Sequence, residues 1–183
     1  MITLLLAGVT ALFLGFSGAY IYSRVQNNLP AINIPPLFYL NTIVLALSSI
    51  TLIHAKQCYL KDNTQRYQIM LALTLGLTLI FLCLQLIAWK SLIDQNILIN
   101  SSTTTSYLYV ISFVHFAHVI GGLPFLVLFT ISAYKKMKEP VSVLIYFSDP
   151  AKKRKLNLLT TYWHYLDALW IYLVLFFLIN SWI

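Results

Sequence analysis

The residues of this sequence that could do chemistry inside a membrane form two pairs with the same spacing. His164 and Asp167 lie three residues apart within the apolar run of residues 156–183. His115 and His118 repeat that spacing in the preceding apolar run. Residues three apart share one face of a helix, and a charge in hydrocarbon usually faces a partner or a cavity. We therefore expect all four side chains to point into a helix bundle, as the structural polar centre at which two helices meet.

Three kinds of chemistry remain open for this centre. A metal or haem site is one, because neutral imidazole is the commonest metal ligand, although a two-haem bundle needs histidines paired between helices at two depths. A proton relay is the second, because His and Asp residues inside a membrane are suited to it. The third is a hydrogen-bonded cluster that fixes the register of two helices, and the rule that buried polar groups have partners favours it.

The composition excludes a soluble globular domain. Of the 183 residues, 60% are hydrophobic and only 9% are charged, which is too little polar surface for such a domain. A membrane-spanning helix needs about 20 mostly apolar residues, and five runs meet this need: residues 1–23, 37–56, 67–89, 107–134 and 156–183. We predict an all-α, polytopic transmembrane helix bundle with five spans, forming a single domain over residues 1–183. The first run has no basic residue before its apolar core, so we interpret it as a retained span rather than a signal peptide.

The basic residues predict how the chain is oriented in the membrane. Ten of the 12 Lys and Arg residues fall on the side of the N-terminus, in or next to the loops 57–66 and 135–155, and only Arg24 and Lys90 fall on the other side. The positive-inside rule then places the N-terminus inside and the C-terminus outside. The net charge of +7 therefore reflects topology and attraction to anionic headgroups, and it gives no argument for binding nucleic acid.

Small residues mark two expected helix contacts. In the first run they recur every four residues, at Ala7, Ala11, Gly15 and Ala19, and such a stripe lets another helix backbone approach closely, within the bundle or from a partner subunit. In the fourth run Gly121 and Gly122 precede Pro124. These glycines predict close packing and a kink in a helix too long to cross the membrane straight.

The longest loop on the predicted inner side, residues 135–155, contains an apolar stretch between two basic clusters. Residues 141–147 could lie at the headgroup boundary or against another subunit. The alternative is a disordered basic loop, and the sequence does not decide between the two.

The last two runs carry motifs that resemble those of a known family. Residues 162–167 read Tyr-Trp-His-Tyr-Leu-Asp and are followed by Trp170, which resembles the YWHFVD-x-x-W signature of subunit III of haem-copper oxidases. Residues 115–121 read His-Phe-Ala-His-Val-Ile-Gly, which resembles that family's HGLHV-x-x-G. The resemblance covers about residues 37–178 and is most specific in these two runs.

The resemblance implies a short, five-helix form of cytochrome c oxidase subunit III in a bacterial plasma membrane. Such a subunit is a non-catalytic part of a proton-pumping terminal oxidase of aerobic respiration, here a cytochrome c oxidase in preference to a quinol oxidase. It supports assembly, phospholipid binding and proton uptake by the catalytic subunit. Its partners are oxidase subunits I and II, membrane lipids and other respiratory complexes, and haem and copper are bound by the partner subunits. By resemblance, His115, His118, His164 and Asp167 are packing and hydrogen-bonding residues rather than metal ligands.

The sequence departs from the family at several acidic positions. Gly18, Ala88 and Asn157 stand where the family usually or frequently has acids, and Phe116 replaces a small residue. A proton-antenna or lipid-headgroup role that depends on these acids is therefore not expected of this chain. The structural role of the histidines and Asp167 does not depend on them. Two alternatives from other classes are a stand-alone membrane haem or metal protein that uses the histidines, and a small proton-coupled transporter that uses His164 and Asp167.

Overall fold

Six helices account for most of the chain in the computed structural model, which describes residues 2–29 and 35–182. They are α1 (Ile2–Gln26), α2 (Pro36–Leu60), α3 (Thr64–Asp94), α4 (Thr103–Lys136), α5 (Pro140–Ser148) and α6 (Pro150–Trp182). All except α5 are long and apolar enough to cross a membrane. The prediction of an all-α protein with five membrane spans is confirmed, and the described residues contain no strand.

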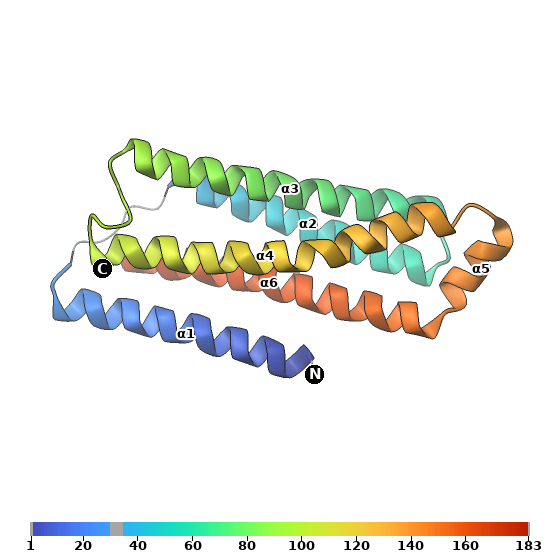
Figure 1. Cartoon of the computed structure of the whole chain (residues 1–183), viewed down its shortest axis with the longest axis horizontal. Helices are drawn as coiled ribbons and strands as arrows, with labels where there is room; N and C mark the ends of the chain where they lie inside the picture. Colours follow the sequence, from blue (N-terminus) through green and yellow to red (C-terminus); the bar gives the residue numbers. More distant parts are fainter. Residues whose placement is uncertain (1, 30–34, 183) are drawn as a thin grey trace.

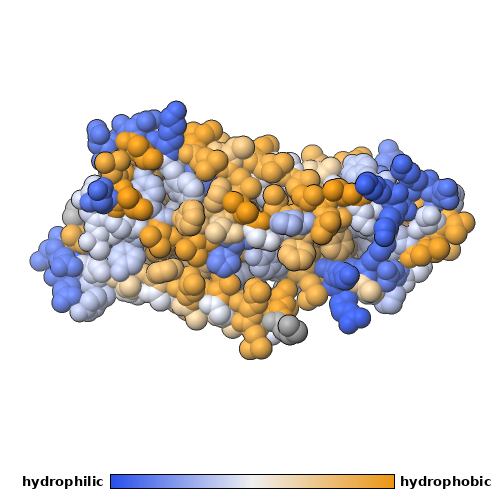
Figure 2. All heavy atoms as spheres, viewed as in Figure 1, coloured by the Kyte–Doolittle hydropathy of each residue, from blue (hydrophilic) through white to orange (hydrophobic). Residues whose placement is uncertain are grey.

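The five long helices lie side by side and alternate in direction along the chain (Figure 1). Contacts join α2 to α3, α3 to α4, α4 to α6 and α6 back to α2, so these four helices form a ring. Helix α1 lies outside the ring against α4 and α6. Exposed hydrophobic residues cover the middle of the molecule and hydrophilic residues gather toward its two ends (Figure 2). This distribution suits a protein whose middle is surrounded by lipid and whose ends meet water.

Local sequence signals fix where several helices begin. Helix α2 begins with Pro36, whose fixed φ suits the first helical position. At the start of α3 the Asn63 side chain accepts a hydrogen bond from the Arg66 backbone at 3.1 Å, and Ser102 does the same for the Thr105 backbone at the start of α4. Each cap satisfies an N–H group that the helix itself leaves free. Helix α4 keeps Pro124 inside its 34 residues and changes direction along its length (Figure 1).

The apolar stretch 141–147 belongs to α5 and is a helix rather than a disordered loop. It packs against its own chain through Tyr146, which is buried in an aromatic cluster with Tyr59 and Tyr67. The Tyr59 hydroxyl donates a hydrogen bond to the Tyr146 carbonyl oxygen at 3.3 Å. The opposite side of α5 stays exposed and apolar, with Val141, Leu144 and Ile145.

The small residues expected to pack fall into two groups. In α4, Gly122 meets α6 so closely that an added Cβ would lie 2.7 Å from a ring carbon of Tyr162, whereas Gly121 has open space beside it. In α1, Ala7, Ala11 and Gly15 are exposed and Ala19 is half-buried, because α1 packs on the ring through Val9, Phe13, Ser17 and Tyr20 instead. The small-residue stripe of α1 therefore contributes little to packing within this chain.

Candidate functional site

His164 is held at the contact between α6 and α2. Its Nδ1 lies 2.6 Å from the Ser49 hydroxyl oxygen, a hydrogen bond between the two helices. The same nitrogen lies 3.9 Å from Oδ2 of Asp167. The His164 side chain is 31% exposed and that of Asp167 only 7%. The three side chains form a compact polar cluster at the edge of the ring, with the carboxylate on its inner side.

The helix geometry explains this cluster only in part. His164 and Asp167 share a face of α6 because they are three residues apart. Their neighbour Ser49 comes from α2, where Thr42 also accepts a hydrogen bond at 3.2 Å from the indole nitrogen of Trp170. Reasoning from the sequence did not identify Ser49 as the partner of His164. The available signal was the hydroxyl-rich stretch of the second apolar run, which is typical of residues that bridge helices.

His115 lies in different surroundings from His164. Its side chain is fully buried in the ring, 5.0 Å between centroids from the Trp170 ring and 6.1 Å from the Phe81 ring. Neither ring nitrogen has a hydrogen-bond partner among the described residues. The surroundings of His115 are therefore aromatic rather than polar.

His118 occupies a third location, on the side of α4 that faces α1. Its Nδ1 donates to the Val114 carbonyl oxygen at 2.7 Å, one turn earlier in the same helix. The ring lies 6.0 Å between centroids from Phe13 of α1. The structure thus brings His164 and Asp167 together but places His115 and His118 apart from them and from each other, instead of gathering all four at one centre. Residues three apart are offset by about 60° around a helix, and α4 contacts α1, α3, α5 and α6, so the two histidines of α4 meet different neighbours.

The arrangement is suited to hydrogen bonding more than to metal binding. Within residues 2–29 and 35–182, no group of three His, Cys, Asp or Glu side chains is placed to hold a metal ion. The expectation that this chain binds no metal or cofactor stays a prediction.

A second buried polar contact joins α2 to α3. The Asn41 amide nitrogen donates to the Gln85 side-chain oxygen at 2.8 Å, and both side chains are fully buried. Gln85 thus forms a hydrogen bond between helices. Such bonds are directional, so they fix the depth and rotation of two helices that are otherwise held by nonspecific apolar packing.

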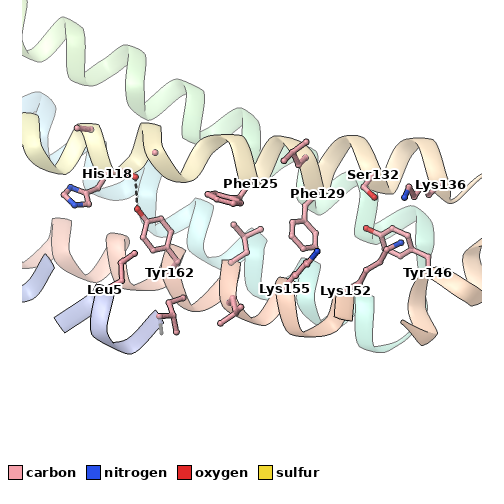
Figure 3. A pocket seen from close by; sticks show the side chains of 16 residues that line it. Leu5, His118, Phe125, Phe129, Ser132, Lys136, Tyr146, Lys152, Lys155 and Tyr162 are labelled. Carbon is pink, nitrogen blue, oxygen red and sulfur yellow. Dashed lines mark hydrogen bonds between the residues drawn. The ribbon is translucent and has the colours of Figure 1, made fainter. Parts of the chain in front are cut away.

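A groove of about 920 Å³ runs along the outer side of the ring, between α1, α4, α5 and α6. Its middle is apolar, with Phe125 and Phe129, while Leu5, His118 and Tyr162 lie at one end (Figure 3). The Tyr162 hydroxyl donates to the His118 carbonyl oxygen at 2.9 Å. The groove has the volume to hold hydrocarbon chains and offers them few polar contacts.

The other end of the groove is basic. Lys136 of α4 and Lys152 of α6 line it together with Ser132 and Tyr146, and Lys155 of α6 lies between this end and the middle (Figure 3). The ammonium nitrogen of Lys152 lies 3.6 Å from the centre of the Tyr146 ring, a cation–π contact. Positive groups at one end of an apolar groove match the amphipathic shape of a phospholipid. The sequence showed the basic clusters but not that two helices bring them to one groove.

The chain is similar to known proteins over most of its length. A family model described as cytochrome c oxidase subunit III matches residues 25–182. A relative described as cytochrome c oxidase subunit 3, from Alkalihalophilus pseudofirmus (strain ATCC BAA-2126 / JCM 17055 / OF4), is 26% identical over 172 residues, which are 93% of this chain and 77% of the relative. The family match includes the whole of α2 to α6 and with them every residue of the polar contacts described above.

Proposed function

The chain belongs to the cytochrome c oxidase subunit III family, and from this premise we propose that it is the accessory subunit III of a proton-pumping terminal oxidase. In this role it supports assembly, lipid binding and proton uptake by the catalytic subunit, and it has no redox centre of its own. Haem and copper are bound by its partners, oxidase subunits I and II. The observation that carries the proposal is the family match over residues 25–182, which contains both histidine motifs.

The placement of the polar residues supports a structural role within that function. His164 is bonded to α2 through Ser49, His118 to its own helix, and His115 is enclosed by aromatic rings. Each of these contacts fixes one helix against a neighbour or against itself. We assign His115, His118, His164 and Asp167 to packing and hydrogen bonding on this ground.

Oxidase that lacks this chain provides the functional test. A complex of the catalytic subunits alone should still reduce oxygen, because the redox centres are in those subunits, but with a lower yield of assembled complex and a lower ratio of pumped protons to electrons. The measurements are oxygen consumption per haem and proton release from reconstituted vesicles. Complete loss of oxygen reduction by a complex that keeps its haem and copper would contradict the accessory role.

Phospholipid is the ligand proposed for the groove. Its apolar middle suits acyl chains, and Lys136, Lys152 and Lys155 suit the phosphate of a headgroup. Each basic side chain near a membrane surface contributes about 1 kcal/mol to the free energy of binding anionic lipid. Because the three lysines lie in the half of the groove next to α5, we expect the lipid to have one orientation, with its headgroup toward α5.

Substitution of the groove lysines tests the lipid proposal. The double variant Lys136→Gln/Lys155→Gln should lose tightly bound phospholipid, measured as phosphorus per complex after detergent exchange. The control Lys61→Gln removes a charge from an exposed lysine next to α2 that does not line the groove. Equal phosphorus content in the control and the double variant would contradict the proposal.

We also propose that the end of the bundle that carries α5 faces the inside of a bacterial cell. The C-terminal end of α4 and the N-terminal end of α6 meet α5 there (Figure 1), and most of the basic residues are near this end. The N-terminus would then be inside and the C-terminus outside, as the positive-inside rule predicts. Labelling of single cysteines at positions 138 and 98 with a membrane-impermeant maleimide tests this orientation, since only position 98 should react in intact cells.

A further inference from the structure

We propose that the outer surface around His164 is the docking site for a transmembrane helix of another oxidase subunit, which presents a hydroxyl or amide side chain to Nε2 of His164. This surface, called here the His164 face, consists of Ala46 and Ser49 of α2 and Thr161, His164 and Ala168 of α6. The proposal rests on the proposed function, because it requires that the chain assembles with oxidase subunits.

The two ring nitrogens of His164 differ in their surroundings. Nδ1 is engaged by Ser49 at 2.6 Å. Nε2 has no hydrogen-bond partner among the described residues, and unlike both ring nitrogens of His115 it is not fully buried. The side chain is 31% exposed, so this nitrogen is open to the outside of the bundle. An imidazole nitrogen always carries either a proton to donate or a lone pair to accept, so Nε2 needs a partner.

His164 lies inside the apolar part of its helix. This part begins at Leu156, eight residues before His164, which is about 12 Å at 1.5 Å per residue, and the other end of the apolar run is further away. Where protein does not cover it, the side chain therefore faces the hydrocarbon of the membrane. A polar side chain at such a depth normally faces protein or a water-filled cavity and not lipid.

The carboxylate next to His164 reinforces this requirement. Asp167 is 93% buried at its side chain, and its Oδ2 has no hydrogen-bond partner in the part of the chain that the structure describes. This oxygen lies 3.9 Å from Nδ1 of His164. Lipid in front of His164 would leave Nε2 without a partner, in a cluster whose carboxylate already has one unpaired oxygen. A polar side chain from another helix would complete the hydrogen bonding of the imidazole.

The shape of the surface suits a helix as the occupant. Thr161 and Ala168 lie about one turn from His164 and on the same side of α6, and Ala46 lies one turn from Ser49 on α2. Thr161, Ala168 and Ala46 are exposed and short, so a helix backbone could come close enough for its side chain to reach Nε2. The outer side of α3, by contrast, presents long side chains such as Leu79 and Ile80. A hydroxyl or amide is the expected group because it can donate or accept, whichever nitrogen of His164 carries the proton.

A photocrosslinking amino acid in the complete oxidase tests the proposal directly. The probe p-benzoylphenylalanine at position 168 should form a covalent adduct with one other oxidase subunit, in a yield several-fold above that of the same probe at position 80 on α3. The adduct peptide, identified by mass spectrometry, should contain a hydroxyl or amide residue within a membrane span. Adducts with lipid alone at position 168, or equal yields at the two positions, would overturn the proposal.

Substitutions of His164 test the chemistry of the contact. His164→Leu should weaken retention of this chain in the complex by about tenfold, the change expected from losing one hydrogen bond of a buried polar group, and His164→Gln should retain more. Full retention of His164→Leu under detergent challenge would count against the proposal. Unfolding of each full-length variant is measured in parallel, and if His164→Leu fails to fold, the probe at position 168 decides. A wild-type chain that does not co-purify with any oxidase subunit would instead overturn the proposed function.

Discussion

Replacing Gly122 by alanine should destabilise the helix bundle, whereas the same replacement at the adjacent Gly121 should not. A Cβ at Gly122 would lie 2.7 Å from Cε1 of Tyr162 and 3.0 Å from Cζ3 of Trp163, and nothing lies within 4 Å of a Cβ at Gly121. Neither ring can move freely, because Trp163 is buried and the Tyr162 hydroxyl is bonded to the His118 carbonyl oxygen. The added methyl group therefore has to push α4 away from α6.

The magnitude follows from two opposing contributions. Overpacking of a tight contact costs about 1 to 3 kcal/mol, and alanine favours a helix over glycine by about 1 kcal/mol. Gly121→Ala should gain up to about 1 kcal/mol from the second contribution alone. Because the helix contribution is common to both variants, Gly122→Ala should be less stable than Gly121→Ala by about 1 to 3 kcal/mol.

Reversible unfolding of the full chain in mixed detergent micelles, followed by tryptophan fluorescence and circular dichroism, measures this difference. Gly121→Ala is the matched control, since it makes the same chemical change one residue away. Equal free energies of unfolding for the two variants would refute the close contact between α4 and α6. The larger variant Gly122→Leu should unfold more easily still, or fail to form the bundle.

Three further outcomes are expected. Asp167→Leu should reduce the yield of assembled complex more than Asp167→Asn does. An amide keeps the shape and part of the hydrogen bonding beside His164, whereas leucine loses about 1 to 3 kcal/mol of stability. A well-assembled Asp167→Asn complex that fails to turn over or pump protons would indicate a proton shuttle instead. Asn41→Leu should lower the free energy of unfolding by about 1 to 3 kcal/mol, because it leaves Gln85 unpaired. In a double-mutant cycle with Gln85→Leu the two effects on the free energy of unfolding should be coupled. Strictly additive effects would argue against the hydrogen bond. Gly15→Leu should leave the unfolding of the isolated chain unchanged, because nothing lies within 4 Å of a Cβ at this position. The same change should lower the retention of the chain in the complex. A lower unfolding midpoint of the isolated variant would mean that α1 packs within this chain through Gly15.

The membrane spans could be predicted from the sequence because the bilayer sets a single length requirement. The helices themselves extend further than the apolar runs. Helix α3 covers Thr64–Asp94 and α6 begins at Pro150, whereas the corresponding runs were residues 67–89 and 156–183. Apolar composition marks the part of a helix that lies in hydrocarbon, and the backbone continues as helix into the polar ends. The helix α5 was not predictable because the seven-residue apolar stretch 141–147 has too little periodicity to decide its fold.

The local geometry of the site could be predicted, but its neighbours could not. That His164 and Asp167 share a face follows from their spacing alone. The partner of His164 depends on which helices lie side by side. It is Ser49 of α2 and neither His115 nor His118. Helices that are apolar on all sides carry no pattern that tells which face is turned to which neighbour. The basic end of the groove is likewise a tertiary feature, since α4 and α6 each contribute lysines to it.

The central claim is that this chain is a subunit of a terminal oxidase and has no redox centre of its own. Purification of the tagged chain in a mild detergent, with mass spectrometry of the co-purifying chains and an optical spectrum, tests it most directly. We expect oxidase subunits I and II to co-purify, with haem absorption in the complex and none in the chain after it has been separated from them. Haem or stoichiometric metal that remains with the separated chain, or a chain that purifies without any oxidase subunit, would contradict the claim.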